Sequence, residues 1–119
     1  MLTVDRYEIH LTRGDTAYLK PFLEVEIEDQ PGKFEPYEYE EGDRVIFRLA
    51  SNSKLVLEKE CMIDLENNKA TLTLIPEDTK DLEPKAYSYC IELVTVYDEH
   101  FTAIENGRFV LGKELEKNA

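Results

Sequence analysis

Hydrophobic side chains alternate with polar ones through most of this sequence, and that period of two constrains the fold more than any other feature. The alternation covers residues 7–11, 19–27, 45–49 and 55–63, and its longest run is residues 87–97. Successive side chains on a β-strand point to opposite faces of a sheet. Each run therefore predicts a strand with one buried face and one solvated face.

Residues that favour turns separate these runs. Asn67-Asn68 predicts a hairpin, and Asn106-Gly107 is the strongest short hairpin signal in the chain. Pro76 followed by acidic residues predicts one helical turn near residues 76–82. Pro21 lacks a backbone donor, which places its strand at a sheet edge or a bulge.

The pattern as a whole indicates an all-β fold. No stretch of ten residues or more shows a helical period, and seven or eight short strands follow one another at regular spacing. This organisation predicts an antiparallel, immunoglobulin-like β-sandwich, with a small barrel as the alternative. A length of 119 residues predicts one domain, with a core over about residues 5–112 and a frayed tail at residues 113–119.

The cysteines and the missing tryptophan argue against a true immunoglobulin domain. Such a domain has a buried Trp, a core disulfide and a Tyr two residues before the second Cys. This chain has no Trp, Ser88 stands two residues before Cys90, and Cys61 and Cys90 lie on opposite parities of their runs. We therefore expect two free thiols and use "immunoglobulin-like" for the architecture alone.

A formal net charge of −12 limits the partners of this protein. Nucleic acids and anionic membranes attract clustered Lys and Arg, so neither is an expected partner. The charge is compatible with simple solubility, with an acidic face for a basic protein, or with mimicry of nucleic acid. The first ten residues carry charges and no apolar segment, so we expect no secretory signal and synthesis in the cytoplasm.

Patterns for catalysis and for ligand binding are scarce. His10 and His100 stand alone, without the spacing of a metal site, and the few glycines form no phosphate-binding loop. We therefore expect no enzyme activity, no metal, no cofactor and no small-molecule substrate.

One segment stands out by its charge. Nine acidic residues lie between Glu24 and Asp43, with Lys33 as the only base and with aromatic residues interleaved. Tyr is favoured at recognition surfaces and Glu can steer a charged partner. The segment is either a protein interface or a solvated acidic face. The candidate interface residues are Glu24, Glu26, Glu28, Phe34, Tyr37, Glu38, Tyr39, Glu40 and Glu41.

The tripeptide Arg13-Gly14-Asp15 matches the sequence that integrins bind, yet the chain favours a plainer interpretation. Gly42-Asp43 repeats the last two letters in front of another β-branched run. Two copies of one signal indicate tight turns in which glycine adopts a positive φ. The predicted structural turn residues are Gly14, Asp15, Gly42, Asp43, Asn106 and Gly107.

The order of these motifs resembles one known family. "LTRGDTAYLKPFLEVEI", "YEEGDRVIFRL", "ATLTLIPEDTKDLEPKAYSYCIEL" and "TAIENGRFVL" follow one another from about residue 7 to residue 111. This order is similar to that of the immunoglobulin-like N-terminal domain of baseplate upper proteins in phages and prophages of Gram-positive hosts. The matching positions are Gly14-Asp15-Thr16, Gly42-Asp43, Val45-Ile46-Phe47, Pro76, Asp78-Thr79, Tyr87, Tyr89, Ile91, Leu93, Gly107 and Phe109.

The resemblance implies a non-enzymatic structural protein of a virion tail or baseplate, made in the bacterial cytoplasm and incorporated into the particle. Its partners would be other virion proteins or further copies of itself, and the family supplies no catalytic residues. Two alternatives remain open. One is an immunoglobulin-like binding or adhesion module outside a virion, and the other is an acidic inhibitor that mimics nucleic acid.

Overall fold

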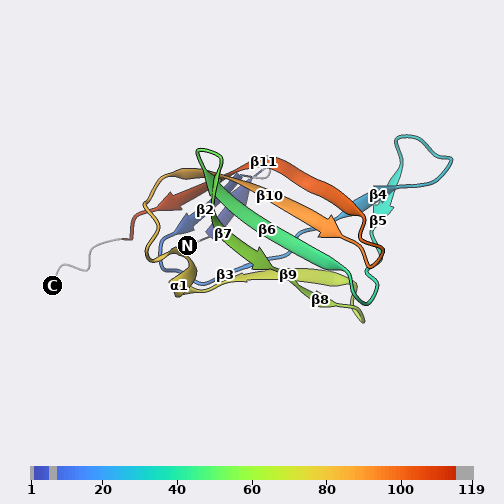
Figure 1. The fold of residues 1–119 in the computed structure, drawn as a ribbon, viewed down its shortest axis with the longest axis horizontal. Coiled ribbons are helices and arrows are strands. Elements are labelled where there is room, and N and C mark those ends of the chain that lie inside the picture. The colour runs from blue at the N-terminus through green and yellow to red at the C-terminus, as the bar shows by residue number, and fades with distance from the viewer. Residues whose placement is uncertain (1, 6–7, 115–119) are drawn as a thin grey trace.

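The computed structural model describes residues 2–5 and 8–114, which form eleven strands and one short helix (Figure 1). The elements in chain order are β1 (Leu2–Asp5), β2 (Glu8–Thr12), β3 (Ala17–Leu19), β4 (Glu24–Glu26), β5 (Phe34–Pro36), β6 (Arg44–Ser51), β7 (Lys54–Glu60), β8 (Met62–Asp64), β9 (Lys69–Leu74), α1 (Pro76–Thr79), β10 (Ala86–Val94) and β11 (His100–Gly112).

Two sheets form the layers of a sandwich. The larger sheet has the strand order β1-β2-β11-β10-β6-β7, and the smaller one has the order β3-β9-β8. All neighbours are antiparallel except β2 and β11, which run parallel. Strands β4 and β5 form a separate hairpin that projects from one end of the sandwich (Figure 1). The predicted all-β sandwich is confirmed.

The core lies between the sheets and follows the predicted parity. On β6, Val45, Phe47 and Leu49 have no exposed surface, while β10 buries Tyr87, Tyr89, Ile91 and Leu93 in alternation. The Phe47 ring stacks on Tyr89, with centroids 5.6 Å apart, and also contacts Phe109 at 6.1 Å. These side chains belong to one continuous cluster, so a single core holds both sheets together.

The connection from β9 to β10 contains the predicted helical turn. Short helix α1 begins at Pro76, and the Ile75 amide donates to the Asp78 carboxylate over 2.9 Å. Lys59 of β7 also contacts this carboxylate at 2.9 Å, which ties the turn to the larger sheet. Beyond the turn, the hydroxyl of Tyr87, which lies at the start of β10, donates to the Glu83 carbonyl.

The run over residues 19–27 is not one strand, contrary to the prediction. It divides into β3 and β4, which lie in different sheets, and residues 20–23 between them are not in a strand. Pro21 has no amide hydrogen to give to a ladder, which explains the break. The expectation of an edge position is confirmed for β3, the outer strand of its sheet.

The run over residues 55–63 divides in the same way. Its first part is β7 of the larger sheet, and its last part is β8 of the smaller sheet. The change of sheet occurs at Cys61, whose amide donates to the Val45 carbonyl over 2.8 Å. Cys61 is buried and Cys90 is partly exposed, as their parities predict, and both are free. Burial raises the pKa of the Cys61 thiol to about 11.

The hairpin predicted at Asn106-Gly107 is wrong. Both residues lie inside β11, and the chain reverses earlier, where the Thr95 amide donates to the Glu99 carbonyl. Tyr89 pairs with Gly107 and Ile91 pairs with Ile104, so β11 has one residue more than β10 in this interval. Asn106 has a φ of 56°, which marks a β-bulge instead of a turn.

The other predicted turns are confirmed. Gly14 and Gly42 have φ values of 83° and 98°, and Asn68, with a φ of 53°, turns β8 into β9. Of the predicted first strand, Tyr7 lies outside the described residues, as does most of the tail predicted to fray, at residues 115–119.

Gly107 is predicted to be essential for the packing of Tyr89. A Cβ atom at position 107 would lie 2.4 Å from the Tyr89 ring, which is buried and stacked on Phe47 and cannot move aside freely. Gly107→Ala should therefore lower the free energy of unfolding by about 2 kcal/mol, the middle of the range for an overpacked core. Chemical denaturation measures this loss.

The matched control is Gly112→Ala on the same strand, where the nearest atom to the added methyl group would be 3.8 Å away. Equal stability of the two variants would show that the Tyr89 ring does not constrain position 107.

Candidate protein-binding surface

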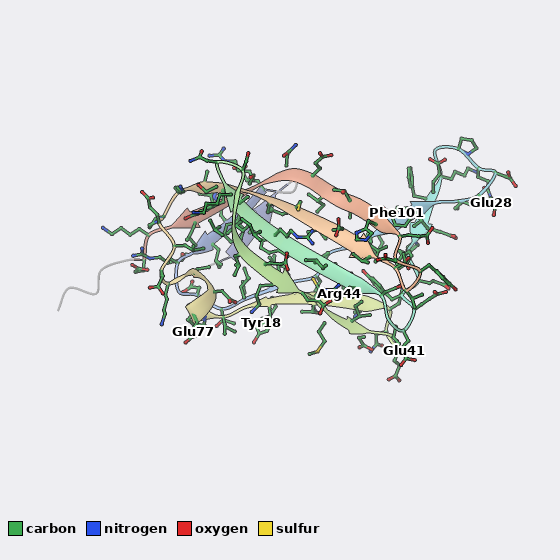
Figure 2. All side chains as sticks on the ribbon, in the orientation of Figure 1. Tyr18, Glu28, Glu41, Arg44, Glu77 and Phe101 are labelled. Atoms are coloured by element: carbon green, nitrogen blue, oxygen red, sulfur yellow. The ribbon has the colours of Figure 1, made fainter. Side chains whose placement is uncertain are left out.

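The acidic residues predicted as an interface gather at one end of the sandwich. Glu24 and Glu26 lie on β4, and Glu38 and Glu40 lie on the segment that leads from β5 to β6. All four side chains are exposed. Figure 2 shows Glu28 at the tip of the β4–β5 hairpin and Glu41 at the turn before β6.

The two tyrosines of this segment turn inward. Tyr37 and Tyr39 are half-buried against the core, with ring centroids 5.3 Å apart and the rings nearly perpendicular. The sequence predicted tyrosines beside the acidic residues at a surface; the structure half-buries both rings, and Tyr37 still lines the groove at this end. Their amphipathic rings anchor the segment while Glu38 between them faces solvent. Of the predicted aromatic residues, Phe34 on β5 is the exposed one.

Asp43 holds this end of the molecule together. Its side chain is only 7% exposed, and one carboxylate oxygen accepts hydrogen bonds from the Tyr37 hydroxyl at 2.7 Å and the Glu40 amide at 2.9 Å. The other oxygen accepts from the Val96 amide at 3.0 Å. A buried carboxylate is stable only when such donors replace its hydration. The predicted turn at Asp43 thus has a further role, which sequence spacing does not indicate.

The β8–β9 hairpin supplies a second set of hydrogen bonds to this segment. The Asn68 side chain accepts a hydrogen bond from the Tyr39 amide at 2.8 Å and donates one to the Tyr37 carbonyl at 2.9 Å. Asn68 was predicted only as a turn residue. The Asn68 side-chain amide supplies one donor and one acceptor to this backbone, as a neighbouring strand would. The segment that carries Glu38 is therefore held both by Asp43 and by Asn68.

An open groove of about 580 Å³ lies between this acidic end and the β10–β11 hairpin. Phe101 and Leu93 are cross-strand partners and therefore point to the same face. Leu93 is 4% exposed, whereas Phe101 is 52% exposed, and both line the groove. Val25 and Tyr97 add further exposed apolar surface to the walls of this acidic groove.

The lining of the acidic groove carries one sign of charge. Within residues 2–5 and 8–114, no Lys, Arg or His lines it, and five glutamates do: Glu24, Glu26, Glu38, Glu40 and Glu99. Figure 2 shows Phe101 near the base of the β4–β5 hairpin. Sequence analysis missed Phe101, Tyr97 and Glu99 because they lie about sixty residues after the segment that they face.

The Arg13-Gly14-Asp15 turn is built into the fold. The Arg13 guanidinium forms an ion pair with Glu114 and donates to the Leu82 carbonyl at 3.3 Å. The Gly14 amide donates to the fully buried Thr79 hydroxyl at 2.9 Å. These contacts join the turn to α1 and support the structural interpretation over an adhesive one.

Within residues 2–5 and 8–114, no cluster of three His, Cys, Asp or Glu side chains could hold a metal ion. No helix in the same ranges is long and apolar enough to cross a membrane. Among the described buried side-chain polar atoms, the Tyr39 hydroxyl is the one without a hydrogen-bond partner.

Comparison with known proteins leaves the chain unassigned: no family model and no curated protein matches it.

The stability of the protein is predicted to respond differently to loss of the hydroxyl at the two inward tyrosines. Tyr37→Phe removes a hydrogen bond to a buried carboxylate and should cost about 1.5 kcal/mol of unfolding free energy. Tyr39→Phe removes a buried, unpartnered hydroxyl, whose desolvation raises the Tyr39 pKa to about 12, and should leave stability unchanged or increase it. Chemical denaturation of both variants compares them directly. Equal destabilisation would contradict the conclusion that, of the two tyrosine hydroxyls, only that of Tyr37 donates to Asp43.

Proposed function

We propose that this protein is a non-enzymatic structural module of a phage or prophage particle, in the tail or baseplate, and that it works through protein–protein contacts. The order of the motifs in its sequence supports the virion context. The acidic groove with exposed apolar walls supports the mode of action and is the single observation that carries the proposal.

The groove has the composition of a recognition surface. Protein interfaces combine an apolar centre with a polar rim, and aromatic residues are enriched in them. Phe101, Val25 and Tyr97 supply such a centre, and the surrounding glutamates supply the rim. Because like charges repel one another at this end of the isolated domain, a partner that contributes Lys or Arg would relieve that repulsion.

The strand order supports an immunoglobulin-like arrangement. Such domains place strands G, F, C and C′ in one sheet and B, E and D in the other. The orders β11-β10-β6-β7 and β3-β9-β8 match these sets in sequence and in neighbours. Tyr87 donates to a carbonyl four residues upstream, in the manner of the tyrosine corner. Tyr87 lies two residues before Tyr89, which is an inward-facing residue of β10. The sequence pattern, which looked two residues before Cys90, found Ser88 instead.

In this arrangement an aromatic pair would replace the usual centre of an immunoglobulin domain. A buried Trp on strand C and a disulfide between strands B and F form that centre in antibody domains. Phe47 on β6 and Tyr89 on β10 occupy the corresponding strands and stack on each other. The aromatic pair offers a physical reason why an intracellular chain of this architecture needs no disulfide.

The virion proposal predicts that the chain is part of purified particles. A host culture treated to induce its prophages would be fractionated on a density gradient, and mass spectrometry would quantify peptides of this chain. We expect them to co-purify with the particles, while an abundant cytosolic enzyme, as the control, does not. Particles that lack the chain, or expression without any particles, would contradict the virion assignment. If the protein were found on the cell surface instead, that result would favour the adhesion alternative.

A further inference from the structure

Strand β11 has a free edge over the half that begins at the hairpin. It pairs with β10 along most of its length, but its other side pairs with β2 only at residues 108–112. Within the part of the chain that the structure describes, no strand pairs with that side of residues 100–107. Their side chains are mostly exposed. A strand edge of this kind offers unpaired backbone donors and acceptors to another chain.

Two cavities lie in succession along this free edge. Phe101, Thr102 and Ala103 border the acidic groove, and Ile104 borders a second cavity of about 700 Å³. Residues 23–26 also line the acidic groove, residues 20–22 line the second cavity, and Glu24 lines both. The second cavity reaches the core, because Phe47 and Tyr89 form part of its wall. An extended chain along the edge would therefore pass both cavities.

The protein itself leaves this position between the sheets open. Strand β3 ends at Leu19, and residues 20–23 continue without strand pairing. Tyr18 and Phe22, which line the second cavity, are both largely exposed. Burial of such apolar surface is favourable by about 25 cal/mol per Å², so an apolar occupant is expected to be stabilised at this position.

The charges select the kind of occupant. Among the residues that the structure describes, the acidic groove carries five glutamates and no base, and Lys20 is the only base that lines either cavity. A second copy of this chain, with a net charge of −12, would meet repulsion here. An occupant with Lys or Arg beside its apolar residues would meet attraction.

We propose that an extended segment of a different, basic protein binds along the free edge of β11 as an added strand. Its inward side chains fill the two cavities, and its Lys or Arg residues pair with the glutamates of the acidic groove. Addition of a strand to a sheet edge combines backbone hydrogen bonds with side-chain pockets of this kind. This mode of binding rests on the proposed function and names the chemistry of the partner.

The bulges in β11 are compatible with a contact that is selective for the sequence of the partner. Register shifts beside Ile91 interrupt regular pairing over residues 102–106, and bulges protect a strand edge from indiscriminate association. The backbone ladder is therefore short. The side chains in the cavities must supply much of the affinity, which makes the contact specific for the sequence of the partner.

Fluorescence anisotropy with designed peptides tests this proposal on the full chain. The probe is a labelled peptide, Lys-Lys-Leu-Thr-Leu-Thr-Leu-Lys-Lys, which alternates apolar and polar residues between basic ends. Three companions change one property each: Ser replaces Leu, Glu replaces Lys, or methyl groups block the backbone nitrogens of the two Thr residues. We expect binding of the first peptide with micromolar affinity and at least about tenfold weaker binding of each companion.

Variants of the protein locate the site. Phe101→Ala and the triple change Glu24→Gln, Glu26→Gln, Glu38→Gln should each weaken binding by about tenfold or more, because hot spots concentrate the binding energy. The controls are Leu55→Ala, which alters a side chain with the same 52% exposure, and the triple change Glu77→Gln, Asp81→Asn, Glu83→Gln near α1. Circular dichroism confirms that each variant is folded.

The outcomes separate this proposal from the virion assignment. Absence of binding, equal binding of the Ser peptide, or equal loss in the control variants would overturn the groove as the site. Unchanged binding of the methylated peptide would overturn strand addition. Any of these results together with co-purification in particles would refute the binding mode alone. Binding as expected by a chain that is absent from particles would refute only the virion assignment.

Discussion

The carboxylate of Asp43 accepts hydrogen bonds from the Tyr37 hydroxyl and from the amides of Glu40 and Val96. These donors belong to the segment before β6 and to the loop between β10 and β11. These two parts supply Tyr37, Glu38, Glu40, Thr95, Tyr97 and Glu99 to the walls of the acidic groove. One buried carboxylate therefore fixes the distance between these two parts, because each donor would lose its partner if either part moved away.

The core explains why the groove remains open. Phe47 and Tyr89 fill the space between the sheets at the centre, and Gly107 allows the Tyr89 ring to lie against β11. The smaller sheet has three strands, fewer than the larger one. Phe101 has the inward parity of a core residue, as its pairing with the buried Leu93 shows, but it lies at the open groove and stays exposed.

Much of the fold could be predicted from local patterns. The parities of β6 and β10, the helical turn at α1 and the turns at Gly14 and Gly42 each depend on a few neighbouring residues, and the structure confirms them. The errors came from competition between distant segments. Asn106-Gly107 is a strong hairpin signal locally, but the long pairing of β10 keeps it within β11, where the glycine accommodates Tyr89. Pro21 was recognised as an edge signal, although the change of sheet after it was not.

The candidate surface was predicted in composition but not in geometry. The acidic residues are visible in the sequence, and Glu24, Glu26, Glu38 and Glu40 do lie together. The orientation of Tyr37 and Tyr39 depends on Asp43 and on Asn68, contacts that no spacing rule indicates. Part of the apolar lining of the groove, Leu93 on β10 and Phe101 on β11, comes from distant strands and joins this surface only when the chain is folded.

Amide hydrogen exchange measured by NMR tests most directly whether Asp43 holds the two walls together. The Val96 and Glu40 amides should exchange slowly in the native protein and at least about tenfold faster in Asp43→Ala, since that ratio corresponds to the loss of one hydrogen bond of about 1.4 kcal/mol. The Leu111 amide, which donates to the Lys85 carbonyl at the far end, should exchange at the same rate in both proteins. Unchanged exchange at Val96 and Glu40, or equal acceleration at Leu111, would contradict the role of Asp43 as the link between the two walls.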